Sequence, residues 1–511
     1  MRLGSLIGLA LCGSLIASAQ TTNPPPTSRL LSLQQCLDMA LSRNLDLQIE
    51  HLSPQIARYD MISAQGAYDP TLSFQAVSRF IEQPGDFDPR KQNPYLPYDD
   101  RSDTVGPDLS GRLPLGLSYE LNAVAGPDSA HTDMRSTDQA ADYPGGVRNT
   151  NNYYADAELT VRQHLLKDFW IDSYREKLLF RKKDLKISQE ALRLQIMKTT
   201  LAVELNFFDL LAAREKIDVE EKALEVKRQF VTETRRRIQV GDLPPLDGQQ
   251  AESQLQNIIT ALTAARQALV EQQNELIGLM TDDFKSWADV DLQPVGPLVA
   301  VQEEPDRFQS FQNALTKRPD VAAARSAVEK SDVAVRFQKN QLFPSLDFTG
   351  TYGGNGIDPQ AGSAISDAVH LRYHQYSYGV VASIPLGNVT ARNDYKASQA
   401  AREVARLQLK KAEQQVLIQI ADYVSRVPSQ FSQTVSTRQA RIYAETALAA
   451  EQKKWQNGLT TSFDVLLFQD ALTAARNAEV DALAEYNKVV AQFAFAEGTI
   501  LERRHLSLEV K

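Results

Sequence analysis

Cysteine and histidine are scarce in this chain, and their scarcity restricts its chemistry. Of 511 residues only two are cysteine, Cys12 and Cys36, and six are histidine. Cys12 lies in an N-terminal segment that we expect to be removed, so Cys36 has no disulfide partner within the chain. His370 and His374 have helical ligand spacing but lie beside a tyrosine-rich strand pattern, and no H-E-x-x-H sequence occurs. The sequence therefore predicts no metal site, no cofactor and no catalytic constellation.

Long apolar runs and an excess of positive charge are also missing. Lysine and arginine total 55 against 64 aspartates and glutamates, a net charge of -9, which argues against nucleic acid as a partner. After the first 19 residues, no apolar run reaches the roughly 18 residues that a membrane-spanning helix needs. Two classes remain: a soluble exported protein, or an outer-membrane protein whose strands hide their apolar residues in alternation.

The N-terminus has the features of a secretory signal. Arg2 precedes an apolar run, and Ala17-Ser18-Ala19 has the A-x-A form of a cleavage site. We therefore expect residues 1–19 to be a signal peptide. Residues 20–29, which include three consecutive prolines, are expected to form an extended leader before a helical pattern starts at Leu30 with Ser32 as a plausible N-cap.

The chain contains an internal duplication. Pro70 matches Pro344 at an offset of 274 positions (344 − 70), whereas Gly241 matches Gly458 at an offset of 217 (458 − 241). The difference, 57 residues, indicates an insertion in the first half, between about 71 and 171. The predicted organisation is a first repeat, 30–281, a linker, 282–306, a second repeat, 307–500, and a C-terminal tail, 501–511.

Helical patterns dominate both halves. Apolar residues recur at heptad spacing within 172–240 and 389–457, and roughly 70 residues of helix would be about 100 Å long. Gly241 and Gly458 follow these segments in the usual position after a helix C-terminus. Because a helical pattern returns after each glycine, we predict two long helical hairpins, 172–281 and 389–500.

Strand patterns follow each matched proline. Apolar and aromatic residues alternate with period two in both halves, and a strand pair is predicted within 344–386. Alternation alone fits a half-buried sheet of a soluble protein, but the crowding of aromatic residues around the strands fits the girdles of a membrane barrel. Four main strands are too few to close a barrel, so if these strands span a membrane, several chains must contribute to one barrel. The candidates for membrane strands are Leu72, Phe74, Leu159, Val161, Phe348, Tyr352, Tyr378 and Val380.

The insertion and three local sequences carry further expectations. Leu113 to Leu121 alternate strictly, which allows an additional hairpin, but the Pro-, Asp- and Gly-rich segments around them predict inserted loops over 84–150. Gly353-Gly354-Asn355-Gly356 is interpreted as a turn. Pro428 should kink or interrupt the second long helix, because proline removes a backbone hydrogen bond.

Three motifs, in their order and spacing, connect this sequence to a known family. They are Lys317-Arg318-Pro319-Asp320-Val321, Leu342-Phe343-Pro344-Ser345-Leu346, and Asn457-Gly458 followed by Phe463-Asp464-Val465-Leu466. With them the mature chain resembles, over essentially its whole length, the TolC-like outer membrane factors, also called outer membrane efflux proteins. Leu45 departs from the family, which usually has proline there.

The resemblance implies a fold and a location. The expected fold is mainly α, a long coiled-coil α-helical barrel fused to a transmembrane β-barrel, with two structural repeats per chain. Each of three chains would give four strands to a barrel of twelve. The protein would lie in the outer membrane, in contact with its lipid, with a long periplasmic extension. Its partners would be a periplasmic adaptor and an inner-membrane transporter of the RND, ABC or MFS class.

The resemblance also points to the two helical turns as the closed end of a tunnel. Asp464 and Asp247 lie where acidic residues face the lumen in such proteins, next to the turn glycines Gly458 and Gly241. Leu467 stands where a second lumen aspartate can occur, and Thr460 where an arginine can link neighbouring hairpins. Three carboxylates on one axis would attract cations and raise one another's pKa. Alternatively, Asp464 caps the returning helix.

Taken together, the sequence predicts a non-enzymatic exit duct of a tripartite efflux or type I secretion system. The alternative is a periplasmic coiled-coil adaptor or structural protein, which would also explain the heptads and the export signal. Adaptors usually carry one hairpin and a lipoyl-like β module rather than two aligned halves that each contain strands. The duct is therefore the preferred interpretation.

Overall fold

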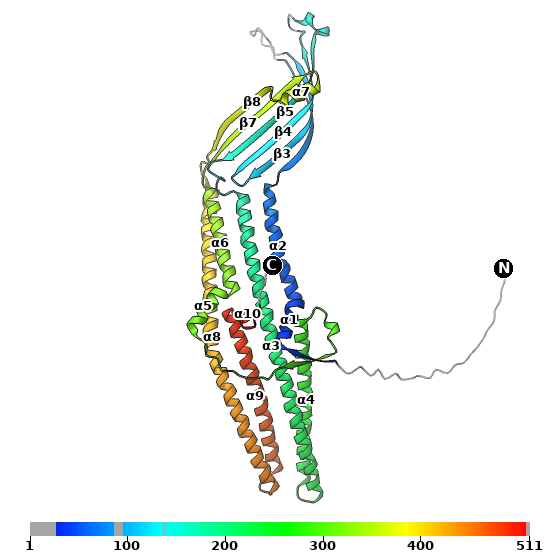
Figure 1. Ribbon diagram of the computed structural model, residues 1–511, viewed down its shortest axis with the longest axis vertical. Coiled ribbons are helices and arrows are strands. Elements are labelled where there is room, and N and C mark those ends of the chain that lie inside the picture. Colours follow the sequence, from blue (N-terminus) through cyan, green and yellow to red (C-terminus); the bar gives the residue numbers. More distant parts are fainter. Residues whose placement is uncertain (1–26, 86–95, 136, 138, 507–511) are drawn as a thin grey trace, which may run out of the picture. The chain divides into compact units, whose positions relative to one another are not determined.

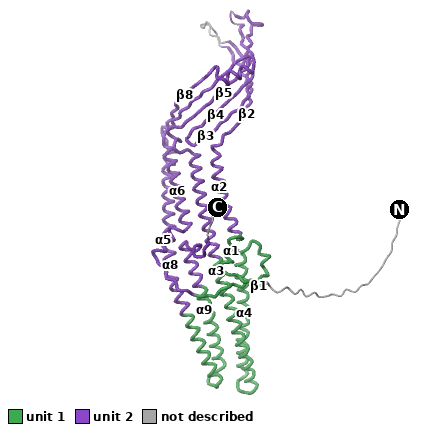
Figure 2. Tube along the Cα trace, viewed as in Figure 1, with its two compact units in different colours: residues 1–44, 203–299, 436–484 green, residues 45–202, 300–435, 485–511 purple. Residues whose placement is uncertain are grey.

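The computed structural model describes residues 27–85, 96–135, 137 and 139–506. The expected signal peptide, Cys12 and most of the expected leader lie outside these residues. Two compact units are described separately below (Figure 2). Unit 1 contains residues up to 44, 203–299 and 436–484, and unit 2 contains 45–202, 300–435 and 485 onward. None of the described helices combines the length and the apolar character needed to cross a bilayer.

The described part of unit 1 begins with a strand rather than with a helix. Strand β1 (Thr27–Ser32) pairs in parallel with β6 (Val290–Val295), in the segment predicted to link the repeats. Helix α1 (Leu33–Arg43) follows, and Ser32 and Gln35 form a capping box at its start. The predicted N-cap is therefore confirmed, but the helix starts three residues later than expected, because Leu30 belongs to β1.

The core of unit 1 next to these strands contains the single cysteine of the described chain. Cys36 and Leu37 of α1 are fully buried and pack with Val203, Phe207 and Ile277. Burial raises the pKa of the Cys36 thiol to about 12, so it stays protonated and unreactive at neutral pH. The residue acts as a small core side chain.

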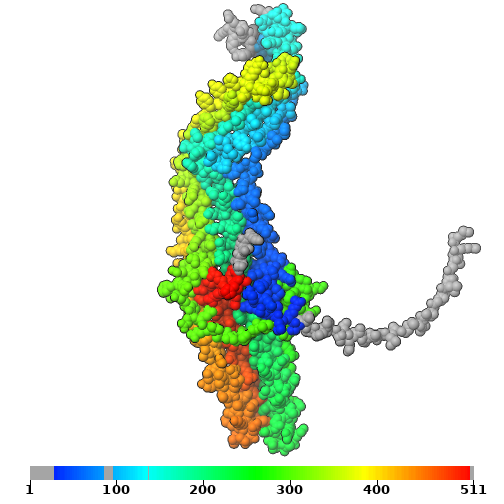
Figure 3. Space-filling view, viewed as in Figure 1, coloured from blue at the N-terminus to red at the C-terminus, as the bar shows by residue number. Residues whose placement is uncertain are grey.

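The two helical hairpins form at the positions that the heptad pattern predicted. Their helices are α3 (Ser173–Gln239) and α4 (Pro245–Met280) in the first half, and α8 (Val389–Gln456) and α9 (Ser462–Glu497) in the second. Figure 3 shows the parts of the two hairpins in unit 1 packed side by side. The expected interruption at Pro428 is wrong: α8 continues through it. The preceding Val427 is fully buried in a cluster with Ile420 and Tyr486, and this packing holds the helix on both sides of the proline.

Unit 2 contains one antiparallel sheet of six strands (Figure 1). Their order in the sheet, β2-β3-β4-β5-β7-β8, is also their order in the chain. Each strand therefore pairs with its sequence neighbour. The strands are β2 (Thr71–Gln83), β3 (Tyr98–Leu113), β4 (Leu117–Asp133), β5 (Val147–His164), β7 (Ser345–Asp358) and β8 (Tyr373–Ser383).

The 57-residue insertion supplies the hairpin β3–β4. The predicted loops over 84–150 are wrong for most of their described length, because 98–113 and 117–133 are strands and β5 starts at Val147. Alternation from Leu113 to Leu121 did indicate a hairpin, although Leu115 lies in its turn. The loop prediction relied on the polar composition of this segment. One face of these strands is polar, and strands can pair through their main chains without apolar side chains. The sheet therefore has six strands instead of the four expected.

Helix α7 (Ala361–Val369) connects β7 and β8 and packs on a glycine-rich part of β7 that was predicted to be a turn. The segment Gly353–Gly356 is part of β7 rather than a turn. A Cβ atom on Gly356 would lie 2.1 Å from the carbonyl oxygen of Ala364, and one on Gly354 would lie 2.5 Å from that of Ala368. These glycines are required because the α7 backbone lies directly on the strand.

Arg318, in the first of the three sequence motifs, connects several helices of unit 2. Arg318 closes α5 and precedes α6, and its guanidinium contacts three elements. It donates to Asp320 (2.7 and 3.0 Å), to Gln419 on α8 (2.8 Å) and to the carbonyl of Ala496 on α9 (3.3 Å). The Arg-Pro-Asp motif thus joins four helices. The helices not yet given are α2 (Leu45–Gln65), α5 (Arg307–Lys317), α6 (Pro319–Asn340) and α10 (Ile500–Arg503).

Candidate functional site at the helical turns

The two turns that end the long helices have the same backbone. Gly241 and Gly458 have φ values of +83° and +72°, which glycine adopts without steric cost. After each glycine the next N–H reaches back to the last helical turn: Asp242 to Arg237 (2.9 Å) and Leu459 to Lys454 (2.9 Å). This is the Schellman pattern of helix C-termini. Both glycines therefore occupy the predicted position.

The carboxylate of Asp464 forms a capping box with Thr461 at the start of α9. The Thr461 hydroxyl and N–H donate to Asp464 Oδ2 (2.6 and 3.3 Å), and the Asp464 N–H donates back to the Thr461 hydroxyl (3.2 Å). Thr460 donates to the same oxygen (3.1 Å). These hydrogen bonds hold the pKa of Asp464 below its ordinary value of 3.8. The capping interpretation of Asp464 is confirmed.

A hydrogen bond joins the two turns. The hydroxyl of Ser462, the first residue of α9, donates to Oδ2 of Asp247 in the first turn of α4 (2.8 Å). Ser462 is buried, whereas Asp247 is half-buried. The turns of both hairpins therefore lie together at one end of unit 1 (Figure 2). Thr460, the position expected for an inter-hairpin link, bonds within its own turn instead.

Polar pairs continue this link along α3 and α9. Lys216 pairs with Asp481 (2.6 Å), Glu220 accepts from Asn477 (2.8 Å), and Lys227 pairs with Asp470. Each step of four or seven residues along α3 is matched by an equal backward step along α9, as an antiparallel helix pair requires. We call these three pairs the α3–α9 seam. Two of its members, Glu220 and Lys227, are buried.

An aromatic contact between α3 and α8 also joins the two hairpins. Trp455 of α8 packs against Phe230 of α3, with ring centroids 5.0 Å apart, and the Arg237 guanidinium lies 4.0 Å from the indole centroid. Val231 and Leu466 belong to the same buried cluster. Apolar packing and the seam together hold α3, α8 and α9 near the turns.

Large apolar side chains are exposed around the turns. Leu459 is 75% and Val240 68% exposed. Leu467, where a second aspartate was expected, is also exposed, so an apolar side chain replaces a charge there. Large apolar side chains thus gather in the exposed part of the two turns. The exposed apolar set is Val240, Leu246, Leu459, Phe463 and Leu467.

The structure brings together most of the residues named from the sequence. Gly241, Asp247, Gly458, Thr460 and Asp464 all lie in the two turns. The eight membrane-strand candidates lie in β2, β5, β7 and β8. Sequence reasoning missed the hydrogen bond from Ser462 to Asp247 and the α3–α9 seam. The matching spacing of Lys216 and Lys227 with Asp481 and Asp470 was a usable signal, but only once α3 and α9 were known to be neighbours.

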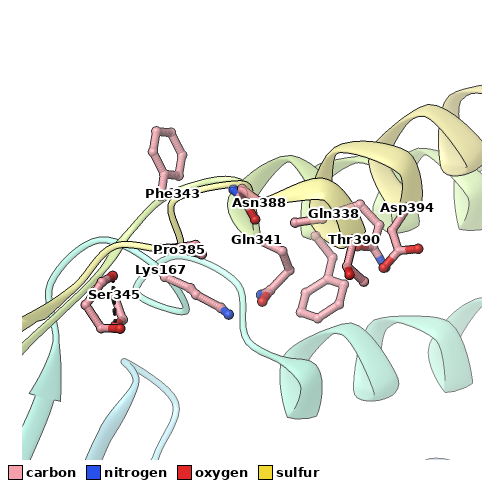
Figure 4. Close-up of a pocket in the computed structure, with 12 residues that line it drawn as sticks. Lys167, Gln338, Gln341, Phe343, Ser345, Pro385, Asn388, Thr390 and Asp394 are labelled. Carbon is pink, nitrogen blue, oxygen red and sulfur yellow. Dashed lines mark hydrogen bonds between the residues drawn. The ribbon is translucent and has the colours of Figure 1, made fainter.

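A pocket of about 550 Å³ in unit 2 is a weaker candidate (Figure 4). It lies where β7 and β8 meet α6 and α8, and its charged lining residues are Lys167 and Asp394. Asn388 beside it donates to the carbonyl of Leu342 (3.1 Å) and so shapes the chain between β8 and α8. Within the described part of the chain, no group of three or more His, Cys, Asp or Glu side chains is placed to hold a metal ion.

Comparison with solved structures identifies the fold. The structure superimposes on the outer membrane protein VceC of Vibrio cholerae with a TM-score of 0.63, over 91% of this chain and 96% of that one, at 17% identity. This chain, with its paired helical hairpins and its antiparallel sheet, thus shares the fold of that outer membrane protein.

Sequence comparison shows which family the chain resembles. The "Outer membrane efflux protein" model matches residues 311–499. The outer membrane efflux protein BepC of Brucella suis is 25% identical over 317 residues, which cover 61% of this chain and 65% of BepC. The outer membrane protein TolC of Vibrio cholerae is 23% identical over 321 residues, 62% of this chain and 69% of that one. The resemblance predicted from the sequence is confirmed: the chain is similar to the outer membrane efflux proteins, in the family model over 311–499 and in its curated relatives over longer stretches.

Proposed function

We propose that the chain is the outer-membrane exit duct of a tripartite efflux or type I secretion system. One observation carries this: the sheet has an apolar and a polar face, in a chain that also contains two long helical hairpins. An apolar face toward lipid and a polar face toward water suit the wall of a membrane channel. The helical hairpins extend the passage into the periplasm.

The duct forms from three copies of the chain. A sheet of six strands is below the roughly eight that closed barrels need, and in a membrane the free edges of β2 and β8 must find partners. Residues 1–19 direct export, and the two repeats, 30–281 and 307–500, supply corresponding parts of the wall.

Transport through this duct is passive. A non-enzymatic role is in keeping with the similarity to outer membrane efflux proteins, and in the proposed duct substrates move by open passage. Energy comes from an inner-membrane transporter of the RND, ABC or MFS class. A periplasmic adaptor connects the two and docks on the exposed apolar set around the turns, because Leu459 and Phe463 need an apolar partner surface.

The turns form the periplasmic aperture. In a trimer, three copies of Asp464 and Asp247 ring the passage and favour cations over anions. The Ser462–Asp247 hydrogen bond and the α3–α9 seam keep the two hairpins of each copy together. Opening the aperture requires the hairpins to separate, so these contacts favour the closed state.

Membrane fractionation and size analysis test the function. The mature chain should partition with the outer membrane, require detergent for extraction and behave as a heat-resistant trimer. A detergent-free, monomeric chain would contradict the duct and favour a periplasmic adaptor or structural protein. Reconstitution in planar bilayers should then give discrete channels, with empty bilayers and heat-dissociated protein as controls.

A further inference from the structure

The inserted hairpin β3–β4 is not a peripheral addition to the sheet. It lies between β2 and β5, because β2 pairs along its length with β3, and β4 pairs along its length with β5. Removing it would leave β2 without its neighbour in the described chain. The hairpin therefore connects β2 to the rest of the sheet, whereas β5 of the same repeat pairs directly with β7.

The hairpin also spans the whole height of the sheet. Its turn, between Leu113 and Leu117, lies level with the ends of the flanking strands, since Leu117 pairs with Gln163, the residue before the end of β5. At the same level His164 pairs with Asp347 near the start of β7. The turn therefore sits at the edge of the sheet from which β5 leads into α3.

Side chains on the hairpin continue the two faces of the sheet without interruption. One row of directly paired residues crosses all six strands and is apolar throughout: Leu72, Leu109, Leu121, Leu159, Tyr352 and Tyr376. The adjacent row has side chains on the opposite face and contains only polar residues and glycine: Ser73, Asp108, Asn122, Glu158, Gly353 and Gln375. A hairpin surrounded by water would not be stabilised by an apolar row that continues the apolar face of its neighbours.

The apolar face of the hairpin has the height of a membrane. On β3 it runs from Leu113 to Val105, and on β4 from Leu117 to Ala125. Nine residues at about 3.3 Å each, tilted by about 40°, span roughly 20–25 Å, close to the apolar band of outer-membrane barrels. Above this band charges begin on the same face, with the Arg101–Asp103 ion pair.

From these observations, and resting on the proposed trimeric duct, we infer that the β3–β4 hairpin is part of the transmembrane wall and that three copies close a barrel of eighteen strands. Six strands alternate in direction, so β8 of one copy runs antiparallel to β2 of the next, and the barrel closes with antiparallel pairs throughout. With strands about 4.8 Å apart and tilted by about 40°, the backbone diameter is about 36 Å, against about 24 Å for twelve strands.

Site-directed spin labelling tests the inference. Leu109→Cys and Asp108→Cys place labels on the two faces of the hairpin, and Leu159→Cys and Glu158→Cys are matched controls on β5. The native Cys36 is buried and needs no replacement. In reconstituted trimers, collision with oxygen relative to a water-soluble nickel complex should be several-fold higher at position 109 than at 108, as between 159 and 158.

The outcomes separate this inference from the proposed function. If position 159 lies in lipid while 108 and 109 are both exposed to water, the hairpin is outside the wall and the inference fails, whereas the duct stands. If 159 is also in water, both fail. Imaging the unmodified trimer in a lipid nanodisc avoids any effect of substitution: eighteen strands in cross-section support the inference, and twelve overturn it.

Discussion

Lys227 on α3 reaches Asp470 on α9 from a position that is only 3% exposed, so an ammonium group from the first hairpin is buried against a carboxylate of the second. The Gln254 side chain lies 3.4 Å from the same ammonium. Burying a charge is unfavourable unless a counter-charge and hydrogen bonds compensate for lost water. Asp470 thus fixes how the hairpins meet.

Asp470→Asn should destabilise the hairpin contact, because Lys227 then lacks its counter-charge. We expect a loss of about 1–3 kcal/mol, the range for a buried polar group that loses its partner. Denaturant unfolding followed by helical circular dichroism measures it. The control is Asp218→Asn, which breaks an exposed pair with Lys222 on the surface of α3 and should change stability by less than about 0.5 kcal/mol. Equal effects of the two variants would contradict this role.

Ser462→Ala should make the aperture easier to open. The variant removes the hydrogen bond to Asp247 that joins the two turns, without changing charge. Channels in planar bilayers should show a higher open fraction or conductance than wild type. Thr263→Ala removes an exposed hydroxyl that bonds only within α4, to Ile259, and should leave conductance unchanged. Wild-type conductance in Ser462→Ala would argue that the turns are held by other contacts.

Asp464→Asn should reduce cation selectivity or cation block at pH 7, and the selectivity of the wild type should persist in moderate acid. The pKa of Asp464 is depressed, so its capping contribution is present above the ordinary value of 3.8 and is lost as pH falls through the lower folded-state value. Reversal potentials measured from pH 7 to pH 3 report how the cation selectivity changes as Asp464 becomes protonated. Selectivity lost above pH 5 would mean that repulsion among three copies outweighs the threonine hydrogen bonds.

Gly356→Ala should displace α7 from the sheet, because its Cβ would lie 2.1 Å from a backbone oxygen of that helix. We expect lower heat resistance of the trimer and faster proteolysis near α7. Gly362→Ala adds the same methyl group within α7, where no atom lies within 4 Å, and should be neutral or slightly stabilising. If both variants resist proteolysis equally, the close packing of α7 is not needed.

The sequence predicted the helices better than the sheet, for a physical reason. Heptads and the glycines Gly241 and Gly458 located both hairpins within a few residues, since helix signals are local. The strands of the insertion were obscured by Pro84–Asp103 and Gly126–Thr150, whose polar composition resembles loops. A strand with one polar face and a partner far away in sequence leaves little local signal.

The residues of the two helical turns could be predicted from the sequence, but most of their contacts could not. Asp464 and Asp247 follow the duplicated glycines and could be named from the offset alone. Their actual partners, Thr461 and Ser462, depend on rotamers and on the contact between two hairpins that lie more than two hundred residues apart. No spacing rule in a single sequence supplies such a contact.

The position of the β3–β4 hairpin has a consequence for how such pores change size. In the proposed trimer each chain supplies one third of the wall, so a single insertion in the sequence is repeated three times around the ring. Because an added element must be a hairpin to preserve alternating strand direction, the circumference grows by six strands at once. In a symmetric trimer of this design the number of barrel strands, and with it the main determinant of pore width, therefore changes only in steps of six.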